Sequence, residues 1–507
     1  MGQLMVSFLG LTPPDWVLEG VSNGDIAAVC LFDYNVSSPA QLREATSALH
    51  EAARLGGQHP PLIGIDQEGG QLMAVTGGAT ELPGNMALGA TRSEELAEQA
   101  GQVLGLELLA LGCNLDFAPV LDLAGHLSSA VVGTRAYGDD PKLVASLGVA
   151  TIRGLQGAGV LATAKHFPGH GDTELDSHHE APVVTRNRAH LELLELVPFR
   201  AAIAAGVKAI MSAHVRYPAI DDAPATLSRA LLTDLLRGEL HYSGLTITDA
   251  MDMRAVADGP AEVRVGQALE AGADLVLLGH LPEQQELLKR FATRYRRPSL
   301  ERIERARSEL PPELPDFGTI GRREHRELAQ AIAERAVTVV RGAGSLPLVI
   351  SSDELLGLVV VEAGDLSPAD TSSGVELQFA RQVRERHAHL NMTTLPYGAG
   401  RGRLSDVLRA LDGCSTILVG TVNAIEDPAQ RGLLEHLHGA GKKIVHLALR
   451  SPADLTVGPP EAPCLCTYGI RPANTEAAVR ILFGEIEASG VLPVKLPGSE
   501  TRPLARS

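Results

Sequence analysis

The stretch LVASLGVATIRGLQGAGVLATAKHF, residues 143 to 167, contains the unit from which the fold of the first half of the chain is predicted. Its first part has the apolar spacing of an amphipathic helix and ends in glycine, the residue expected just after a helix. Its last part, LATAKHF, has the length and composition of a short buried strand. Helices that alternate with buried strands are typical of folds built on a parallel sheet.

The same unit recurs from residue 1 to about residue 280. Apolar, β-branched runs predict eight strands, and helical patterns lie between most of them. The runs are LMVSFLG (4–10), IAAVCLF (26–32), LIGID (62–66), LDFAPVL (115–121), LATAKHF (161–167), AIMSAHV (209–215), LTITDA (245–250) and DLVLLG (274–279). Eight such units predict an α/β fold of the (β/α)8 TIM-type barrel class, whose usual size is about 250 residues. An open parallel sheet is the alternative.

Polar side chains stand at or just after the carboxyl ends of five predicted strands. They are Asp66, Asp122, His166, His214 and Asp249. Active sites of barrels lie at that end of the strands, so the pattern predicts that these five side chains converge on one rim. Simple solvation of the strand ends is the competing explanation.

A second domain is expected after the stretch RSELPPELPDFGTIG, residues 307 to 321, where proline, glycine and acidic residues cluster. Further helical and strand patterns follow in HRELAQAIAERAVTVVRG, LGLVVVEAG, STILVGTVN and KKIVHLALRS. We therefore predict a catalytic barrel over 1–308, a linker over 309–321 and a smaller α/β sandwich domain over 322–507.

Composition narrows the class of protein. The chain is 45% apolar and 21% charged, values near the average for globular proteins, and its formal charge is -17. That charge argues against nucleic acid and anionic lipid as partners. Five scattered cysteines form neither a disulfide framework nor a thiolate zinc site, and neither a signal peptide nor a membrane span is evident. We expect a cytoplasmic protein without a membrane segment.

The segment KHFPGHGDTELDSHHE, residues 165 to 180, permits three interpretations. Its GHG turn does not complete a phosphate-binding motif. It holds six possible metal ligands, namely His166, His170, Asp172, Asp176, His178 and His179, but glycine and proline indicate a loop rather than the rigid support that zinc sites use. Thirdly, Asp176 and His178 are two residues apart, so in an extended segment the carboxylate can hold one imidazole nitrogen and leave the other for proton transfer. A solvated loop with incidental histidines remains a further alternative.

The segment KHFPGHGDTELDSH closely resembles the signature of glycoside hydrolase family 3, in its NagZ-type branch of β-N-acetylglucosaminidases. The resemblance continues through GIDQEGGQL, LPGNMALGAT, NLDFAPVLDL, VVGTRAYGDDP, MSAHVRYPAIDDAPATLS and GLTITDAMDM. The last part of the chain, TYGIRPANTEAAVRILFGEIEASGVLPVKLPG, is similar to the C-terminal sandwich of longer members. Together these stretches cover most of the chain.

This resemblance implies a retaining double displacement. Asp249 matches the family's nucleophile, which forms a glycosyl-enzyme intermediate, while Asp252 is its rival three residues later. His178 matches the acid and base, oriented by Asp176, in place of the second carboxyl group that most retaining glycosidases use. A neutral imidazole does not repel an anion as a carboxylate does, so phosphate could replace water as the acceptor.

Substrate contacts are implied at Asp66, Arg135, Lys165 and His166, which match positions that bind hydroxyls of the terminal sugar. His214 is grouped with them, with support of the nucleophile's strand as its alternative role. Each of the others also has a structural alternative. Asp66 could cap the next helix, and Arg135 could form a surface ion pair with Asp139. Lys165 and His166 could bond to backbone carbonyls. The chain departs from the family at Gln71 and Ala74, where two arginines are usual. Alanine cannot replace an arginine fork, so a different sugar preference is possible.

The sequence therefore predicts an exo-acting β-N-acetylhexosaminidase that releases N-acetylglucosamine from muropeptides or chitin-type fragments. No metal and no cofactor are expected. The expected binding partner is a small oligosaccharide or muropeptide substrate, and the expected oligomeric state is a monomer or a homodimer. A family 3 phosphorylase or a β-glycosidase of altered specificity is the nearest alternative. A metal-dependent hydrolase and a non-catalytic sugar-binding protein are further ones. The C-terminal domain has three possible roles: completing the pocket, mediating dimerisation or stabilising the barrel.

Overall fold

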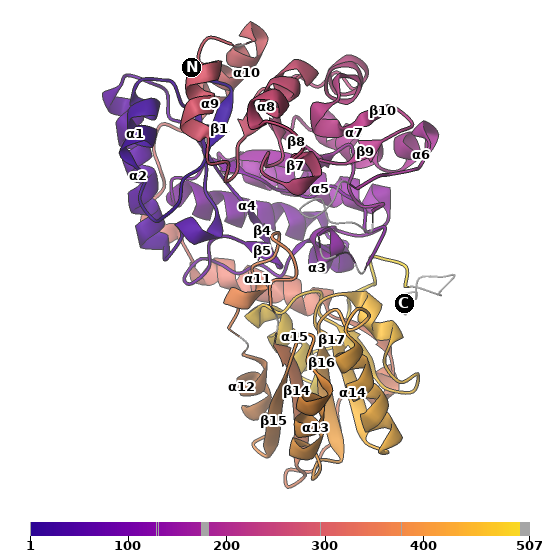
Figure 1. Cartoon of the computed structure of the whole chain (residues 1–507). Coiled ribbons are helices and arrows are strands. Elements are labelled where there is room, and N and C mark those ends of the chain that lie inside the picture. Colours follow the sequence, from indigo (N-terminus) through magenta and orange to yellow (C-terminus); the bar gives the residue numbers. More distant parts are fainter. Residues whose placement is uncertain are drawn as a thin grey trace.

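The computed structural model describes residues 2–127, 129, 131–173, 182–294, 296–362, 364–376 and 378–496. The first half of the chain forms one body and the second half a smaller one beside it (Figure 1). The chain starts on the side of the first body that faces away from the second. The carboxyl ends of the first body's central strands are directed toward the second body, so both bodies border the space between them.

Eight parallel strands form the central sheet of the first body, in the order β11-β8-β7-β6-β3-β2-β1-β12. They are β1 (Leu4–Val6), β2 (Ala28–Cys30), β3 (Leu62–Ile65), β6 (Leu115–Asp116), β7 (Leu161–Phe167), β8 (Ala209–Ser212), β11 (Leu245–Thr248) and β12 (Val276–Leu277). A parallel bridge between Ile247 and Leu275 joins the two outermost strands of that order. The sheet closes on itself, which confirms the predicted barrel and excludes the open sheet.

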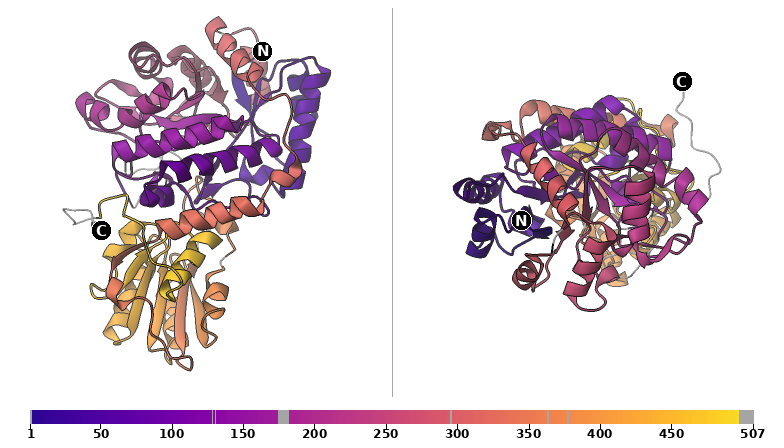
Figure 2. Two further views of the ribbon diagram at one scale, coloured as in Figure 1. Left: turned by 180° about the vertical axis from the view of Figure 1, so that it is seen from behind. Right: turned by 90° about the horizontal axis from the view of Figure 1, so that it is seen from above.

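Helices surround the barrel on its outside (Figure 2). They are α1 (Asp15–Ser22), α2 (Pro39–Leu55), α3 (Asn85–Thr91), α4 (Glu94–Ala110), α5 (Pro141–Gly157), α6 (Arg188–Leu193), α7 (Leu196–Ala204), the π-helix η4 (Ala230–Glu239), α8 (Ala261–Ala271), α9 (Gln284–Phe291) and α10 (Arg297–Ser308). The long helices α2, α4 and α5 begin at Ser38, Ser93 and Asp140, whose side chains accept a backbone N–H of the first turn. The helix in the quoted unit, α5, thus starts after the polar cap Asp140 and ends at Gly157.

Side chains alternate between the two faces of the barrel wall, as strand geometry requires. Met5 belongs to the cluster that fills the barrel interior, whereas Leu4 and Val6 pack outward with the helices. Gly64 of β3 leaves room for the bulky interior residues, because a Cβ there would lie 2.6 Å from the ring of Phe117 and 2.7 Å from Met5. Side chains therefore fill the described interior of the barrel around Gly64, below the rim.

The second body contains a six-stranded sheet in the order β13-β18-β17-β16-β14-β15, with only β13 antiparallel to its neighbour. The strands are β13 (Thr338–Arg341), β14 (Leu356–Glu362), β15 (Leu390–Pro396), β16 (Thr416–Thr421), β17 (Lys443–Ala448) and β18 (Cys464–Cys466). The helices are α11 (Arg323–Ala336), α12 (Phe379–Arg384), α13 (Arg401–Ala410), α14 (Pro428–Gly439) and α15 (Pro472–Leu482). The predicted α/β domain after the barrel is confirmed.

Helix α11 lies across the junction of the two bodies (Figure 2). It packs against α3 and α4 of the barrel and against α15 of the second domain. Ala329 and Ile332 belong to the barrel's outer core, while Ala333 and Val337 belong to the core of the second domain. One helix therefore contributes to both cores, and the boundaries 1–308, 309–321 and 322–507 stay a prediction.

All five cysteines are buried and free. Within the described ranges, no helix combines the length and the apolar character that crossing a bilayer requires.

The packing of the barrel interior predicts that Gly64→Val destabilises the protein. Its branched side chain would overlap Phe117 and Met5, and overpacking of this kind costs about 1–3 kcal/mol. Gly157→Ala, at the end of α5 where nothing lies within 4 Å of the added Cβ, should leave the urea midpoint unchanged or raise it slightly. Equal midpoints for Gly64→Val and the wild type would contradict this account of the interior.

Candidate active site

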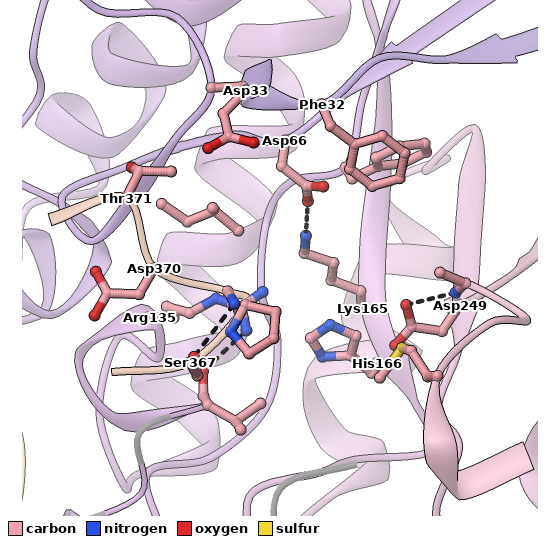
Figure 3. Close-up of a pocket in the computed structure, with 18 of the residues that line it drawn as sticks. Phe32, Asp33, Asp66, Arg135, Lys165, His166, Asp249, Ser367, Asp370 and Thr371 are labelled. Atoms are coloured by element: carbon pink, nitrogen blue, oxygen red, sulfur yellow. Dashed lines mark hydrogen bonds and ion pairs between the residues drawn. The ribbon is translucent and has the colours of Figure 1, made fainter. Parts of the chain in front are cut away.

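A cavity of about 520 Å³ opens at the carboxyl ends of the barrel strands. Segment 365–371 of the second domain forms part of its wall, as Figure 3 shows with Ser367, Asp370 and Thr371. Five of the residues predicted from the sequence line this cavity, namely Asp66, Arg135, Lys165, His166 and Asp249. Lys165 and His166 lie in the last part of β7, while the other three follow β3, β6 and β11, so the barrel brings together residues that are far apart in the chain.

Lys165 is the centre of a buried ionic network. Its ammonium group lies 2.5 Å from Asp66 Oδ1 and 2.7 Å from Glu68 Oε1. Glu68, in the short strand β4 (Gln67–Gly69), also receives a two-pronged ion pair from Arg135, with N–O distances of 2.8 and 2.6 Å. Arg135 therefore pairs with Glu68 rather than with Asp139, the surface partner considered from the sequence.

Charge balance keeps this network ionised. Burial acts to raise the pKa of Glu68, but Arg135 and Lys165 outweigh it and lower the pKa to about 2. Burial likewise opposes the charge on Lys165, whose pKa is nevertheless raised by Asp66 and Glu68. The cavity floor thus presents a fixed ammonium group beside a partly exposed carboxylate at Asp66. Such a pair can bind sugar hydroxyls as both donor and acceptor.

Asp122 holds the first histidines of segment 165–180. Its Oδ2 accepts a hydrogen bond of 2.6 Å from His166 Nδ1, and its Oδ1 accepts the backbone N–H groups of His166 and His170. Burial raises the pKa of Asp122, but the charge and hydrogen bonds of His166 reverse this and bring it below its ordinary value. Nδ1 of His166 is committed to Asp122, so Nε2 is the ring nitrogen left for contact with a ligand. Burial lowers the pKa of His170 to about 4, which keeps that ring neutral.

Asp249 directly follows β11 and lines the cavity. Its Oδ1 accepts the backbone N–H of Ala250 at 2.8 Å, which fixes the carboxylate (Figure 3). Asp252 lines the same cavity, but its Oδ2 accepts both the backbone N–H and Nδ1–H of His280 at 2.8 Å. The rival carboxylate is thus bound to an imidazole at the cavity wall.

His214 lies below the cavity rather than on its wall. It is fully buried and is not one of the described residues that line the space. Nε2 donates to the carbonyl oxygen of Ala250 at 2.9 Å, and Nδ1 lies 2.8 Å from Thr226 Oγ1. This position is consistent with the alternative role predicted from the sequence, support of the strand end that carries Asp249, and the role of His214 stays a prediction.

Asp176 and His178 lie outside the described residues, in the range 174–181. Their placement as acid, base and orienting group stays a prediction. Three of the six possible metal ligands, Asp176, His178 and His179, fall in the same range. Over the described parts of the chain, no group of three or more histidine, cysteine or acidic side chains is arranged to hold a metal ion.

Gln71, at a position where the family usually has arginine, joins the barrel to the second domain. Its Nε2 donates to the carbonyl oxygen of Ala369 at 3.0 Å, and its Oε1 accepts from Thr134 at 3.2 Å. The backbone of Thr371 bonds back to Gln71 at 3.0 Å. Ala74, the second changed position, lines the cavity beside this contact. The C-terminal domain completes the cavity wall, one of the three roles considered from the sequence.

Residues 1–297 match the glycosyl hydrolase family 3 N-terminal domain, which is more than half of the chain. The chain belongs to glycosyl hydrolase family 3. It is 30% identical to β-hexosaminidase A of Pseudoalteromonas piscicida over 95% of this chain and 91% of that protein. It is 40% identical to a β-hexosaminidase of Nitrosomonas eutropha over 57% of this chain and 83% of that one.

A solved family 3 β-N-acetylglucosaminidase from Paenibacillus sp. str. FPU-7 superposes with a TM-score of 0.91. It is 34% identical, and the match covers 97% of each chain. The resemblance inferred from the sequence is confirmed, and the protein is a glycoside hydrolase.

Two parts of the site escaped sequence reasoning. Glu68 was not singled out, although it stands two residues after Asp66, on the same side of an extended segment. The residues of segment 365–371 carry no motif and lie about 300 positions from their barrel partners, as in the contact of Gln71 with Ala369. Of the two, only Glu68 could have been predicted from the sequence, by its spacing from Asp66.

The buried network predicts that Glu68→Gln is strongly destabilising. The substitution would leave Lys165 and Arg135 as buried cations without their shared carboxylate, and breaking such a pair costs about 3–5 kcal/mol. Glu51→Gln, which changes an exposed pair with Arg54, serves as the matched control and should leave the urea midpoint unchanged. A similar small effect of both substitutions would show that the network contributes little.

Glu195 gives the fold a pH dependence near neutrality. Burial, aided by Asp122 and Asp172, raises its pKa from 4.5 to about 8. Its Oε2 would lie 2.5 Å from a Cβ at Gly169, so the carboxyl group packs directly under the loop that follows β7. The folded chain keeps a proton that the unfolded chain loses, so stability falls as pH rises from about 4.5 to about 8.

We therefore expect Glu195→Gln to remove this component of the pH dependence. Relative to the wild type, the variant should gain stability between about pH 5 and about pH 8, by up to about 1.4 kcal/mol per pH unit. Thermal or urea unfolding at several pH values measures the difference. Parallel stability curves for the two proteins would contradict the raised pKa.

Proposed function

We propose that this glycoside hydrolase is a retaining, exo-acting β-N-acetylhexosaminidase that removes a terminal N-acetylglucosamine. The observation that carries the proposal is the placement of Asp249 in one cavity with the Asp66–Lys165 pair. A carboxylate nucleophile needs a sugar held rigidly in front of it, and the floor network can hold one by its hydroxyls. The names of the relatives, β-hexosaminidase and β-N-acetylglucosaminidase, support the hexosamine.

In the first step, a carboxylate oxygen of Asp249 bonds to the anomeric carbon while the glycosidic C–O bond breaks. The leaving oxygen takes a proton from His178, which Asp176 orients. The backbone N–H of Ala250, 2.8 Å from Asp249 Oδ1, directs one oxygen, so the carboxylate does not rotate freely. His214 contributes indirectly by fixing the Ala250 carbonyl.

In the second step, His178 takes a proton from water, and the water oxygen bonds to the anomeric carbon as the carboxylate of Asp249 leaves. Two successive displacements return the sugar with its original β configuration. The protons balance, because His178 gives one in the first step and receives one in the second. Asp176 stabilises the imidazolium form of His178.

Exo action is supported by the closed floor and wall of the cavity. The side chain of Lys165 is 2% exposed, and segment 365–371 stands across from Asp249 in Figure 3. A terminal sugar fits such a space, whereas an internal sugar of a long chain needs an exit on both sides. Because Asp66, Lys165 and Arg135 are fixed by ion pairs, they cannot move to adapt to a sugar without the matching hydroxyl, and such a sugar would lose hydrogen bonds.

Charge favours water over phosphate as the acceptor. The described lining of the cavity contains the carboxylates of Asp33, Asp66, Asp249, Asp252, Asp365 and Asp370. Asp66 pairs with Lys165, Asp252 with His280 and Asp370 with Arg450, which leaves Asp33, Asp249 and Asp365 to set the sign of the charge. The permanent cations of the lining, Lys165 and Arg135, are committed to Asp66 and Glu68. A phosphate dianion would enter a field of its own sign. We therefore expect hydrolysis and no appreciable phosphorolysis.

The proposal is tested by 4-nitrophenol release from aryl β-N-acetylglucosaminide and aryl β-glucoside, with and without phosphate. We expect the hexosaminide to be preferred and phosphate to yield no sugar 1-phosphate. Asp249→Ala should lower kcat at least about 1,000-fold. Azide, a small external nucleophile, should partly restore it and give the α-glycosyl azide, because a single displacement inverts the anomeric centre.

Asp252→Ala is the matched control, since it removes a carboxylate from the same cavity. It should retain activity that azide does not increase. Azide rescue of Asp252→Ala instead of Asp249→Ala would reassign the nucleophile. A folded wild-type enzyme that cleaves only the glucoside would overturn the hexosaminidase proposal.

A further inference from the structure

We propose that Phe32, Tyr34 and His280 form a subsite for the sugar next to the terminal one, and that this subsite accepts an uncharged or cationic hexosamine but disfavours an anionic one. The inference rests on the proposed hexosaminidase function. The preferred substrates would then be chitin-type oligosaccharides, including partly deacetylated ones, rather than muropeptides. The three residues follow β2 and β12, on the opposite side of the barrel from β7.

The three rings form one continuous wall of the cavity. The rings of Phe32 and Tyr34 stack with centroids 5.4 Å apart and planes 17° apart. His280 joins them at 4.8 Å from Phe32 and 5.1 Å from Tyr34. All three residues line the cavity that contains Asp249. Flat aromatic faces are apolar and carry partial negative charge, so they suit the C–H face of a pyranose ring.

The wall is held in place before any ligand arrives. Asn35 accepts the backbone N–H of Phe32 at 2.9 Å and donates to the carbonyl oxygens of Phe8 and Gly10. His280 is fixed by two hydrogen bonds to Asp252. Gly279 has φ of +60°, and an added Cβ would lie 1.9 Å from Asp252 Oδ1, so only glycine allows this approach. Such rigidity reduces the entropy lost on binding.

The ring wall lies where the rest of the substrate would leave the cavity. The side chain of His280 is 45% exposed, whereas that of Lys165 on the floor is 2% exposed. If the floor network binds the terminal sugar, the following sugar extends toward the exposed part of the lining. Phe32 and Asp33 appear above Lys165 in Figure 3, on the same side as Asp66.

Charge at this wall is negative. Asp33 is exposed and stands between Phe32 and Tyr34 in the sequence, while the hydrogen bond to Asp252 raises the pKa of His280. A protonated His280 forms a neutral ion pair with Asp252, so the net negative charge of the wall comes from Asp33. The cations of the described lining, Lys165 and Arg135, are paired at the floor. The carboxylate of an N-acetylmuramic acid residue would meet like charge here, while the ammonium group of a glucosamine residue would meet opposite charge.

The test compares disaccharides with the same terminal N-acetylglucosamine and a second sugar of different charge. The second sugar is N-acetylglucosamine, glucosamine or N-acetylmuramic acid. Methyl β-N-acetylglucosaminide, whose one-carbon aglycone does not reach the rings, is the reference for each enzyme. We expect kcat/KM for the anionic disaccharide to be at least about five-fold below that of the uncharged one at low salt. The difference should shrink as salt rises.

Two substitutions of His280 separate the ring from its hydrogen bond. The readout is kcat/KM for the uncharged disaccharide divided by kcat/KM for the methyl glycoside. His280→Ala should lower this ratio by about 2- to 10-fold. His280→Phe keeps a ring without the bond to Asp252 and should retain most of the ratio. Asp33→Lys should raise the anionic-to-uncharged ratio at least about five-fold. Glu44→Lys, an equal charge change on the exposed face of α2, should leave it unchanged.

The outcomes distinguish the two proposals. Hydrolysis of the anionic disaccharide at a rate equal to or above that of the uncharged one overturns the subsite. An unchanged ratio in His280→Ala also overturns it, while the hexosaminidase proposal stands. If the folded wild type cleaves neither the methyl nor the aryl hexosaminide, the proposed function fails and the subsite fails with it.

Discussion

The site depends on the carboxylate of Glu68, which two buried cations share. Lys165 arrives from the end of β7 and Arg135 from the segment after β6, and both meet Glu68 in the hairpin after β3. Each of these side chains is at most 3% exposed, so none can rely on water for its charge. Loss of any one leaves a buried charge uncompensated. The network therefore fixes the relative positions of three strand ends at the barrel rim, and Asp66 is held by the same lysine.

The second domain acts on this rim through short polar contacts. Gln71 and Thr371 join the barrel hairpin to segment 365–371, and Arg471 donates to the carbonyl oxygen of Gly70 at 2.8 Å. In the family, position 71 usually carries an arginine. Here a neutral amide binds backbone groups of the second domain. Gln71 therefore makes a structural contact that shapes the cavity wall, and the two domains are parts of one site.

The sequence was sufficient for the barrel, because buried parallel strands and amphipathic helices leave a pattern of period and length. It missed β15 and β18 of the second domain. β15 is mostly half-exposed and mixed in character, so it has no distinct pattern, whereas β18 is a short, fully buried apolar run of the kind that predicted the barrel strands. Strand-end position and the family motif together predict site roles for Asp66, Arg135, Lys165, His166 and Asp249, and all five line the cavity. Strand-end position alone does not tell whether a side chain reaches the cavity, as Asp249 does, or packs beneath it, as His214 does. The contributions of segment 365–371 and of His280 depend on tertiary contacts that sequence spacing does not reveal.

Trapping of the covalent intermediate tests the central claim, that Asp249 attacks the sugar, most directly. In a 5-fluoro-N-acetylglucosaminyl fluoride, the 5-fluoro group slows both displacements, but the anomeric fluoride is a good leaving group that keeps the first one fast. The covalently labelled enzyme therefore accumulates. We predict that peptide mass analysis finds one sugar attached to Asp249. Attachment to Asp252, or turnover of the reagent with inversion and no labelled enzyme, would contradict the account.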